Sequence, residues 1–397
     1  MRNKWLYLSG TATSAFGDGI QNIAMVWFLL QMTHSPLVIG GLIAVNYLPA
    51  LLLAPWAGVY ADHRDAQKLA VKVDLLRTAG VAVITVLVFF EIHSVIIFYL
   101  LQAVLAVGNT LFKPASQALV KETFLDEDLI FVLTKSSSFN LTATFIGTGA
   151  AGVLMAISPV FCFVINGLSF LVSALCNNRL QRVNKRTVTA KSFSVRADLQ
   201  KGWDFIRNTK GMLYLLFLSI ISSASLQMSN TLLAPYVDNY LGGSAFLFAT
   251  LDIAFTVGGV LAGLLVSKAL QKWGPYVALI TLGGLGVFSL LAGFRPGLVW
   301  VVAMIFGLGF FTMFHLVTMQ TLIQVNTPKE IIGCVVGLRS IIASSTKISA
   351  GLATGFFLEM VDIRYVFWGF TALVVLSLLT SGKAKEVPVP MHGAVKV

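Results

Sequence analysis

The chain has 397 residues, of which 57% are hydrophobic and only 11% are charged, and its mean hydropathy is +0.84. This composition excludes an ordinary soluble domain and indicates an integral membrane protein. The net charge of +11 is explained by Lys and Arg residues beside membrane spans, so we expect no nucleic-acid partner.

Twelve apolar runs along the chain are each long enough to form a membrane span. A hydrocarbon core of about 30 Å takes roughly 20 helical residues. Unpaired backbone is costly in lipid, and the alternating pattern of barrel strands is absent, so helices are the remaining solution. We therefore predict an all-α membrane protein with twelve transmembrane helices, at residues 5–31, 37–61, 69–90, 95–118, 132–157, 160–177, 212–236, 244–270, 275–294, 298–324, 333–358 and 365–381.

The first run contains an acidic residue, Asp18, about 20 Å from its predicted inner end by helical rise. A charge inside a span costs at least about 2.5 to 3.5 kcal/mol on insertion scales unless it faces a partner or a cavity. A buried carboxylate can take up a proton on one side of the membrane and release it on the other. We interpret Asp18 as a proton carrier, with Asn22 one turn further along; a permanent ion pair is the alternative.

A short charged connector with the sequence GVYADHRDAQK joins the second and third runs. Asp62 could meet the partly positive start of the eleventh helix, a contact worth about 0.3 to 1 kcal/mol, and Arg64 or Arg77 could complete a charge cluster. Such a cluster would close an inner gate, whereas the plainer interpretation is a solvated inner loop. The residues that we assign to this gate are Gly58, Asp62, Arg64, Lys68, Asp74 and Arg77.

The fourth run carries a polar stripe at helical spacing, formed by Gln102, Asn109 and Lys113. We expect this face to meet substrate or an ion-pair partner.

The long hydrophilic connector between Asn177 and Met212 carries nine basic residues and separates six runs from six. Val195, Leu199 and Trp203 recur there at helical spacing, which predicts an amphipathic helix on the inner leaflet; a plain charged linker is the alternative. The predicted domains are a six-helix bundle at 1–178, this connector at 179–211, a second six-helix bundle at 212–382 and a cytoplasmic tail at 383–397.

Polar residues also lie inside the runs of the second half. Asp252 and Lys347 reach a depth comparable to that of Asp18, and we hypothesise that Asp18 or Asp252 exchanges a proton for contact with Lys347 or with substrate. Permanent ion pairs remain the alternative for both. The other candidates for substrate contact in this half are Gln227, Asn230 and His315, although a lone histidine is also a common packing residue.

The two halves resemble each other faintly, since WAGVYADHRDAQK at the end of the second run is similar to LAGLLVSKALQKW at the end of the eighth. Two rocking halves around a central site are what alternating access requires. The connector GVYADHRDAQK is similar to the signature loop of the major facilitator superfamily, and the chain resembles its drug/proton antiporter branch, which contains macrolide-efflux and enterobactin-export proteins. The stretches NTLFKPASQALV and DLQKGWDFIRNTKGMLYLL also resemble that branch. The resemblance implies two pseudo-symmetric six-helix bundles, with helices one, four, seven and ten lining the cavity.

We expect a proton-coupled exporter of amphipathic small molecules, such as a drug or a secreted siderophore-like or metallophore-like compound. A proton-coupled importer and a non-transporting receptor or lipid-handling protein are the alternatives. No phosphate-binding Gly-x-x-x-x-Gly-Lys loop occurs, which argues against an ATP-driven pump, and the spans contain neither a His/Glu zinc spacing nor a Gly-x-Ser-x-Gly elbow. We therefore expect neither an enzyme nor a cofactor or metal. The expected setting is a monomer in the cytoplasmic membrane of a bacterium, with both termini in the cytoplasm because Lys and Arg gather on that side.

Overall fold

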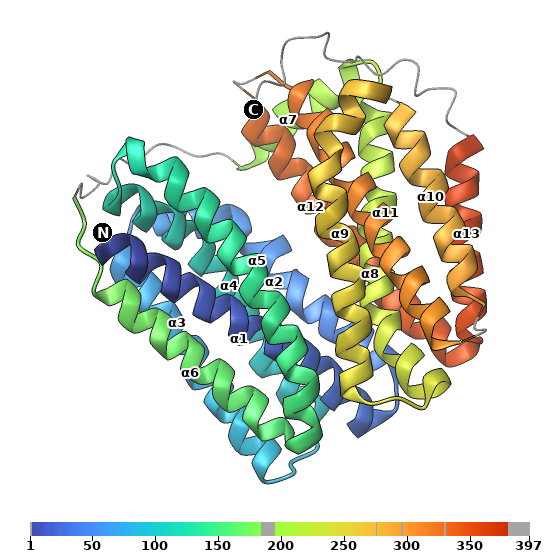
Figure 1. Ribbon diagram of the computed structural model, residues 1–397. Helices are drawn as coiled ribbons and strands as arrows, with labels where there is room; N and C mark the ends of the chain where they lie inside the picture. The colour runs from blue at the N-terminus through green and yellow to red at the C-terminus, as the bar shows by residue number, and fades with distance from the viewer. Residues whose placement is uncertain (1, 184–194, 275, 295–296, 329–330, 380–397) are drawn as a thin grey trace. The chain divides into compact units, whose positions relative to one another are not determined.

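The computed structural model describes residues 2–183, 195–274, 276–294, 297–328 and 331–379. These residues form helices and connecting turns, with no strand among them, which confirms the prediction of an all-α protein (Figure 1). The predicted tail and part of the central connector lie outside the described residues. The helices are α1 (Arg2–Thr33), α2 (Pro36–Asp62), α3 (Ala66–Phe89), α4 (Val95–Thr123), α5 (Asp126–Ile157), α6 (Pro159–Asn178), α7 (Val195–Asn208), α8 (Met212–Leu241), α9 (Ala245–Trp273), α10 (Tyr276–Ala292), α11 (Leu298–Val325), α12 (Ile332–Met360) and α13 (Ile363–Leu379).

Every helix except α7 coincides with one of the twelve predicted runs. Eight of the described helices are long and apolar enough to cross a membrane by length and composition, and α10 and α13 are shorter apolar helices of 17 residues each. Several helices continue past the apolar run into charged sequence, as α4 does through Lys121 to Thr123. Hydropathy therefore locates the spans but underestimates the length of the helices that contain them.

Helix α7 lies where the sequence predicts an amphipathic helix. Ile206 is buried, whereas Trp203 and Lys201 are exposed, so one face packs and the other does not. The packed face lies against α12, where a Cβ added at Gly202 would come within 2.9 Å of the Cys334 carbonyl oxygen. A glycine at this position therefore permits the close approach of α7 to α12.

The chain divides into two compact units. The first comprises Met1–His34, Val45–Phe193 and Gly242–Thr250, and the second comprises Ser35–Ala44, Ser194–Leu241 and Leu251–Val397. Each unit therefore includes the first residues of one helix, α9 or α2, whose remainder belongs to the other unit. The domain boundaries expected from the sequence remain a prediction.

In the first unit, α1 packs against α5 and α6, and α3 packs against α4 and α6. The backbones of α1 and α5 approach closely, because a Cβ at Gly147 would collide with the carbonyl group of Phe16 and one at Gly19 would collide with that of Thr144. Small residues at helix crossings allow this proximity in membrane proteins, where packing rather than the hydrophobic effect holds helices together.

In the second unit, α8 packs against α11 and α12, and α10 packs against α11 and α13. Ser225 on α8 and Thr312 on α11 share a hydrogen bond of 3.0 Å, and both residues are buried. Gly274, which follows α9, has a positive φ, a left-handed conformation that side chains disfavour and that commonly ends helices.

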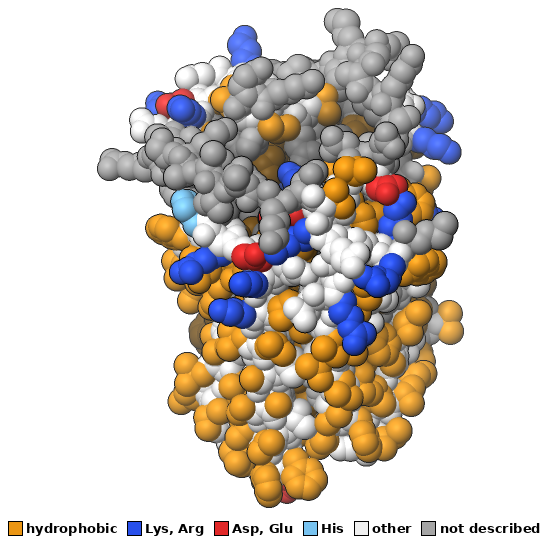
Figure 2. All heavy atoms as spheres, turned by 90° about the vertical axis from the view of Figure 1, so that its left-hand side faces the viewer, with side chains coloured by type: hydrophobic (Ala, Val, Ile, Leu, Met, Phe, Trp, Pro, Cys, Tyr) orange, Lys and Arg blue, Asp and Glu red, His pale blue; other side chains and the backbone are white. Residues whose placement is uncertain are grey.

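Many of the described surface residues are apolar. On the face shown in Figure 2, charged side chains lie in the upper and middle parts of the view, and hydrophobic side chains cover most of the lower part. Many large hydrophobic residues are exposed, among them Leu100, Ile96 and Leu168. An apolar surface of this extent is appropriate for contact with lipid rather than water.

Candidate functional site

The charged connector between α2 and α3 is organised by Asp65. Its carboxylate accepts a 3.0 Å hydrogen bond from the backbone N–H of Lys68 and thereby caps the start of α3. Arg64 is exposed and its guanidinium lies 5.4 Å from the centre of the Tyr60 ring. The side chains of Gly58 and Asp62 lie outside those that the structure describes, so the expected contact of Asp62 stays a prediction.

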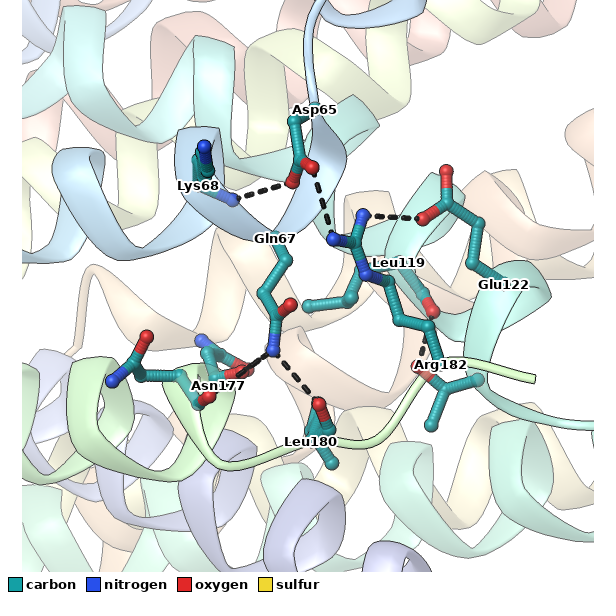
Figure 3. Close-up of polar contacts among 10 residues, drawn as sticks. Asp65, Gln67, Lys68, Leu119, Glu122, Asn177, Leu180 and Arg182 are labelled. Carbon is teal, nitrogen blue, oxygen red and sulfur yellow. Dashed lines mark hydrogen bonds and ion pairs between the residues drawn. The ribbon is translucent and has the colours of Figure 1, made fainter. Parts of the chain in front are cut away.

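Arg182, from the segment that follows α6, binds two carboxylates of the first unit (Figure 3). One Nη donates to Asp65 at 2.9 Å and the other donates to Glu122 at 3.1 Å, near the end of α4. The Arg182 and Glu122 side chains are only 11% and 10% exposed. We call Asp65, Glu122 and Arg182 the Arg182 cluster. It links the start of α3, the end of α4 and the segment that follows α6.

The electrostatics of the cluster favour its charged form. Burial alone would raise the pKa of Asp65, but the Lys68 N–H and the Arg182 guanidinium outweigh it and hold that pKa below its ordinary value.

Next to the Arg182 cluster, the Gln67 amide donates to the carbonyl oxygens of Asn177, Asn178 and Leu180 at 2.9, 3.2 and 2.9 Å, which fixes the end of α6 (Figure 3).

Asp74 and Arg77 lie apart from this cluster, buried between α3, α4 and α6. Arg77 donates to Asp74 at 3.2 Å, and Asp74 also accepts from Ser173 at 2.8 Å and Asn177 at 3.1 Å. The Arg77 guanidinium carbon lies 4.5 Å from the centre of the Phe112 ring. A carboxylate with three donors is well satisfied, so this pair is a packed element of the first unit.

Asp18 projects from the middle of α1, and its side chain is exposed. The charges of Arg77 and Asp74 both act on it electrostatically, so three ionisable groups of the first unit share one region. Asn22, one turn further, is also exposed. These two residues therefore present polar groups on one accessible face of α1.

A chain of amides crosses the first unit close to the Asp18 face. Gln21 donates to Gln102 at 3.3 Å, Gln102 donates to Asn46 at 2.7 Å, and Asn166 donates to Gln21. The predicted stripe on α4 is therefore split, because Gln102 belongs to this network whereas Asn109 and Lys113 are exposed. Gln21 was not predicted from the sequence.

In the second unit, the predicted polar residues do not share one environment. Asp252 and Lys347 are half-buried and Asn230 is exposed. Gln227 is 1% exposed, and neither of its amide atoms has a hydrogen-bond partner among the described residues. His315 is fully buried, with Nδ1 2.9 Å from the Thr281 hydroxyl, a placement that suits a packing residue.

Arg339, on α12, is an ionisable residue that we did not predict. It is half-buried, and its Nε donates to the Ser219 hydroxyl on α8 at 3.2 Å. The same cost argument that identifies Asp18 applies to it, because it lies within the predicted run 333–358. Among the described residues, no group of three or more His, Cys, Asp or Glu could hold a metal ion.

Comparison with known proteins identifies the family. The sequence profile described as Major Facilitator Superfamily matches residues 7–348 and 215–392. The chain belongs to the Major Facilitator Superfamily. The predicted twelve-helix fold of this superfamily is thereby confirmed, as is the prediction that the chain is not an enzyme. It is a multi-pass membrane transporter.

Several proteins to which this chain is similar in sequence are efflux proteins. The chain is 21% identical over 389 residues to macrolide efflux protein A of Streptococcus pyogenes, covering 96% of this chain and 95% of the relative. It is 25% identical over 280 residues to the staphyloferrin A transporter of Staphylococcus aureus, covering 68% of each chain. The crystal structure of the nucleoside transporter NupG matches with a TM-score of 0.80 at 12% identity, covering 98% of this chain and all of that one, which concerns the fold alone.

Proposed function

We propose that this transporter is a proton-coupled exporter of amphipathic small molecules that works by alternating access. The similarity to efflux proteins supports the direction of transport. The observation that carries proton coupling is the exposed carboxylate of Asp18 in the middle of α1, inside a predicted span, with a second carboxylate and a guanidinium within electrostatic reach. Lipid contact alone does not stabilise such a charge.

The charge balance around Asp18 suits a single proton. Asp18 and Asp74 both lie within electrostatic reach of Arg77, which forms its ion pair with Asp74, so the three groups together carry one net negative charge when all are ionised. Binding of one proton at Asp18 makes the group neutral, whereas Asp74 keeps its hydrogen bonds to Ser173 and Asn177. A neutral group is stabilised in a closed apolar interior and a charged one in an interior open to water, which couples the proton to the conformation.

The setting that we propose follows from the distribution of Lys and Arg. With both termini in the cytoplasm, the basic central connector and the loop from Gly58 to Lys68 lie on the cytoplasmic side of the bacterial inner membrane. We propose that the transporter acts as a monomer whose partners are protons, lipid and a small-molecule substrate. Alternating access would then expose Asp18 first to one side of the membrane and then to the other.

The proposal is tested with Asp18→Asn in everted membrane vesicles. We expect Asp18→Asn to abolish accumulation of a macrolide driven by a pH gradient but to retain counterflow, which needs no net proton movement. The matched control is Asp204→Asn, because Asp204 is an exposed carboxylate of α7, outside the apolar helices. Gradient-driven accumulation in Asp18→Asn would exclude Asp18 as the proton carrier.

The same vesicles separate the alternatives. An importer would move the substrate out of everted vesicles when the gradient is applied. Movement that is insensitive to an uncoupler would favour a lipid-handling protein or receptor without gradient coupling.

A further inference from the structure

Arg339 is a cation inside an apolar helix with no acidic partner among the described residues. It lies seven residues after Ile332, about 10 Å along α12 by helical rise. None of the ion pairs between described residues involves it, and its one hydrogen bond is to Ser219. A charge in this setting costs about 2.5 to 3.5 kcal/mol on insertion scales unless something compensates it.

The guanidinium of Arg339 retains free donors. Its two Nη groups donate to no described residue, yet they are not among the unpartnered polar atoms that are sealed from solvent. Arg77 in the first unit is the contrasting case, because its guanidinium is paired with Asp74 and almost completely buried. Arg339 is therefore anchored through Nε while its fork of Nη donors stays accessible, a geometry that suits a bidentate oxyanion.

Ser219 adds a donor beside the guanidinium. Its hydroxyl accepts from Arg339, so that hydrogen bond leaves the hydroxyl hydrogen unused; Ser219 itself is only 4% exposed, so a ligand would reach it from the Arg339 side. Ser223 on the next turn donates to the Ser219 carbonyl oxygen at 3.0 Å, which satisfies Ser223 within α8. On α8, Ser219 is thus the side chain that hydrogen-bonds to Arg339.

The sequence around Arg339 contains cations and no carboxylate. From Ile332 to Leu358, the ionisable residues of α12 with a full charge are Arg339 and Lys347, and the portion of α8 from Met212 to Val237 contains none. Asp204 of α7, which packs against α12, forms no ion pair with Arg339. No carboxylate of these segments therefore compensates the charge of Arg339, which attracts an anion.

We propose that Arg339 and Ser219 form a binding subsite for a carboxylate or phosphate oxyanion. The inference rests on the proposed function where the oxyanion belongs to the cargo, and it then narrows the cargo to amphipathic molecules that carry an acidic group. The same chemistry would also bind the headgroup of an anionic lipid. In both cases the two Nη groups and the Ser219 hydroxyl donate hydrogen bonds to the oxyanion.

The test is binding of citrate to the purified full chain in detergent, without any gradient, so that its failure says nothing about proton coupling. The neutral triethyl ester of citrate is the matched ligand that lacks the oxyanion. We expect citrate to bind and the ester not to bind, with affinity at least tenfold weaker in Arg339→Gln and several-fold weaker in Ser219→Ala. The control Arg364→Gln removes an exposed arginine of the same unit and should bind as the wild type does.

A second arm distinguishes the source of the oxyanion. The chain is placed in nanodiscs of phosphatidylcholine alone or with phosphatidylglycerol, and thermal unfolding is measured. Stabilisation by phosphatidylglycerol that is lost in Arg339→Gln, without citrate binding, assigns the site to a lipid headgroup. Arg339→Lys guards against misfolding, because it keeps the charge and should retain part of the affinity. Equal responses of Arg339→Gln and Arg364→Gln to both probes, or no response of the wild type to either, would overturn the proposal.

Discussion

The Arg182 cluster provides a sharp test of how the first unit is held together. Replacing Arg182 by Gln removes the only charged donor of the cluster and leaves the carboxylates of Asp65 and Glu122 facing each other without a cation. Glutamine keeps much of the aliphatic stem, so the change concerns mainly charge and hydrogen bonds. We expect a marked loss of stability with little change in the helices themselves.

The magnitude follows from the exposure of each partner. The Asp65 side chain is 33% exposed, so its pair resembles a surface ion pair worth about 0.2 to 1 kcal/mol. The Glu122 side chain is 10% exposed, and a hydrogen bond to such a charged group is worth about 1.5 to 3 kcal/mol. The total is about 3 kcal/mol, which lowers the unfolding midpoint of a unit of this size by roughly 6 to 12 °C.

The assay is thermal unfolding of the purified chain in detergent, followed by tryptophan fluorescence. The control is Arg179→Gln, which makes the same change at an exposed arginine three residues earlier. A midpoint of Arg182→Gln equal to that of Arg179→Gln would refute the reasoning. In a background of Asp65→Asn and Glu122→Gln, the cost of Arg182→Gln should shrink, because no carboxylate is then left without its cation.

The pH dependence of the Asp65 pair has a definite sign. The pKa of Asp65 in the folded protein lies below its ordinary value, so its stabilising contribution is present above the ordinary carboxyl range near pH 4 and is lost as the pH falls through the lower folded value. In a Glu122→Gln background, the difference between Arg182→Gln and Arg179→Gln should therefore be equal at pH 5 and pH 8. A difference that disappears at pH 5 would contradict the assigned ion pair.

Three further variants test the packing of the helices. Gly147→Leu should strongly reduce the folded fraction in detergent, because even a Cβ there collides with α1, whereas Gly263→Leu should be tolerated because nothing lies within 4 Å of its added Cβ. Gln67→Ala should lower the free energy of unfolding by roughly 1 to 3 kcal/mol, because the two amide hydrogens that Gln67 shares among three carbonyl oxygens at the end of α6 are lost, and an equally stable variant would show that these contacts contribute nothing. Asp74→Asn should cost roughly 3 to 5 kcal/mol by leaving Arg77 buried without its carboxylate, and removal of both charges should recover part of that loss.

The spans could be predicted from sequence because lipid leaves the backbone no other solution than the helix. The residues that pair with the charges of the connector could not be predicted from sequence. The gate that we assigned to Gly58, Asp62, Arg64, Lys68, Asp74 and Arg77 stays a prediction. We did not single out Asp65, whose position directly before α3 is the usual place of an N-cap. Its partner Arg182 lies 117 residues away in the sequence. In the sequence, Arg182 is one of several basic residues of the connector, and nothing there sets it apart from those that determine membrane topology. Only tertiary structure distinguishes such a residue from its neighbours.

Helical periodicity predicted which residues share a face but not what the face contacts. Gln227 and Asn230 were both candidates for substrate contact; Gln227 is buried and Asn230 is exposed, so the two residues lie in different environments. In a bundle, a polar face can lie against another helix as readily as against a cavity, and hydropathy does not separate the two. Arg339, by contrast, was visible in the sequence as a charge inside an apolar run, and the cost argument applied to Asp18 would have found it.

The two proposals assign different tasks to the two units, and this separation can be tested. If Asp18 carries the proton and Arg339 binds the oxyanion, then Asp18→Asn should bind citrate with normal affinity, because the carboxylate and the guanidinium belong to different units. Arg339→Gln should still couple a neutral cargo to the pH gradient, because the group formed by Asp18, Asp74 and Arg77 is unchanged. Loss of both functions in each single variant would mean that one shared group handles proton and cargo, which contradicts the assignment of proton and oxyanion to separate side chains.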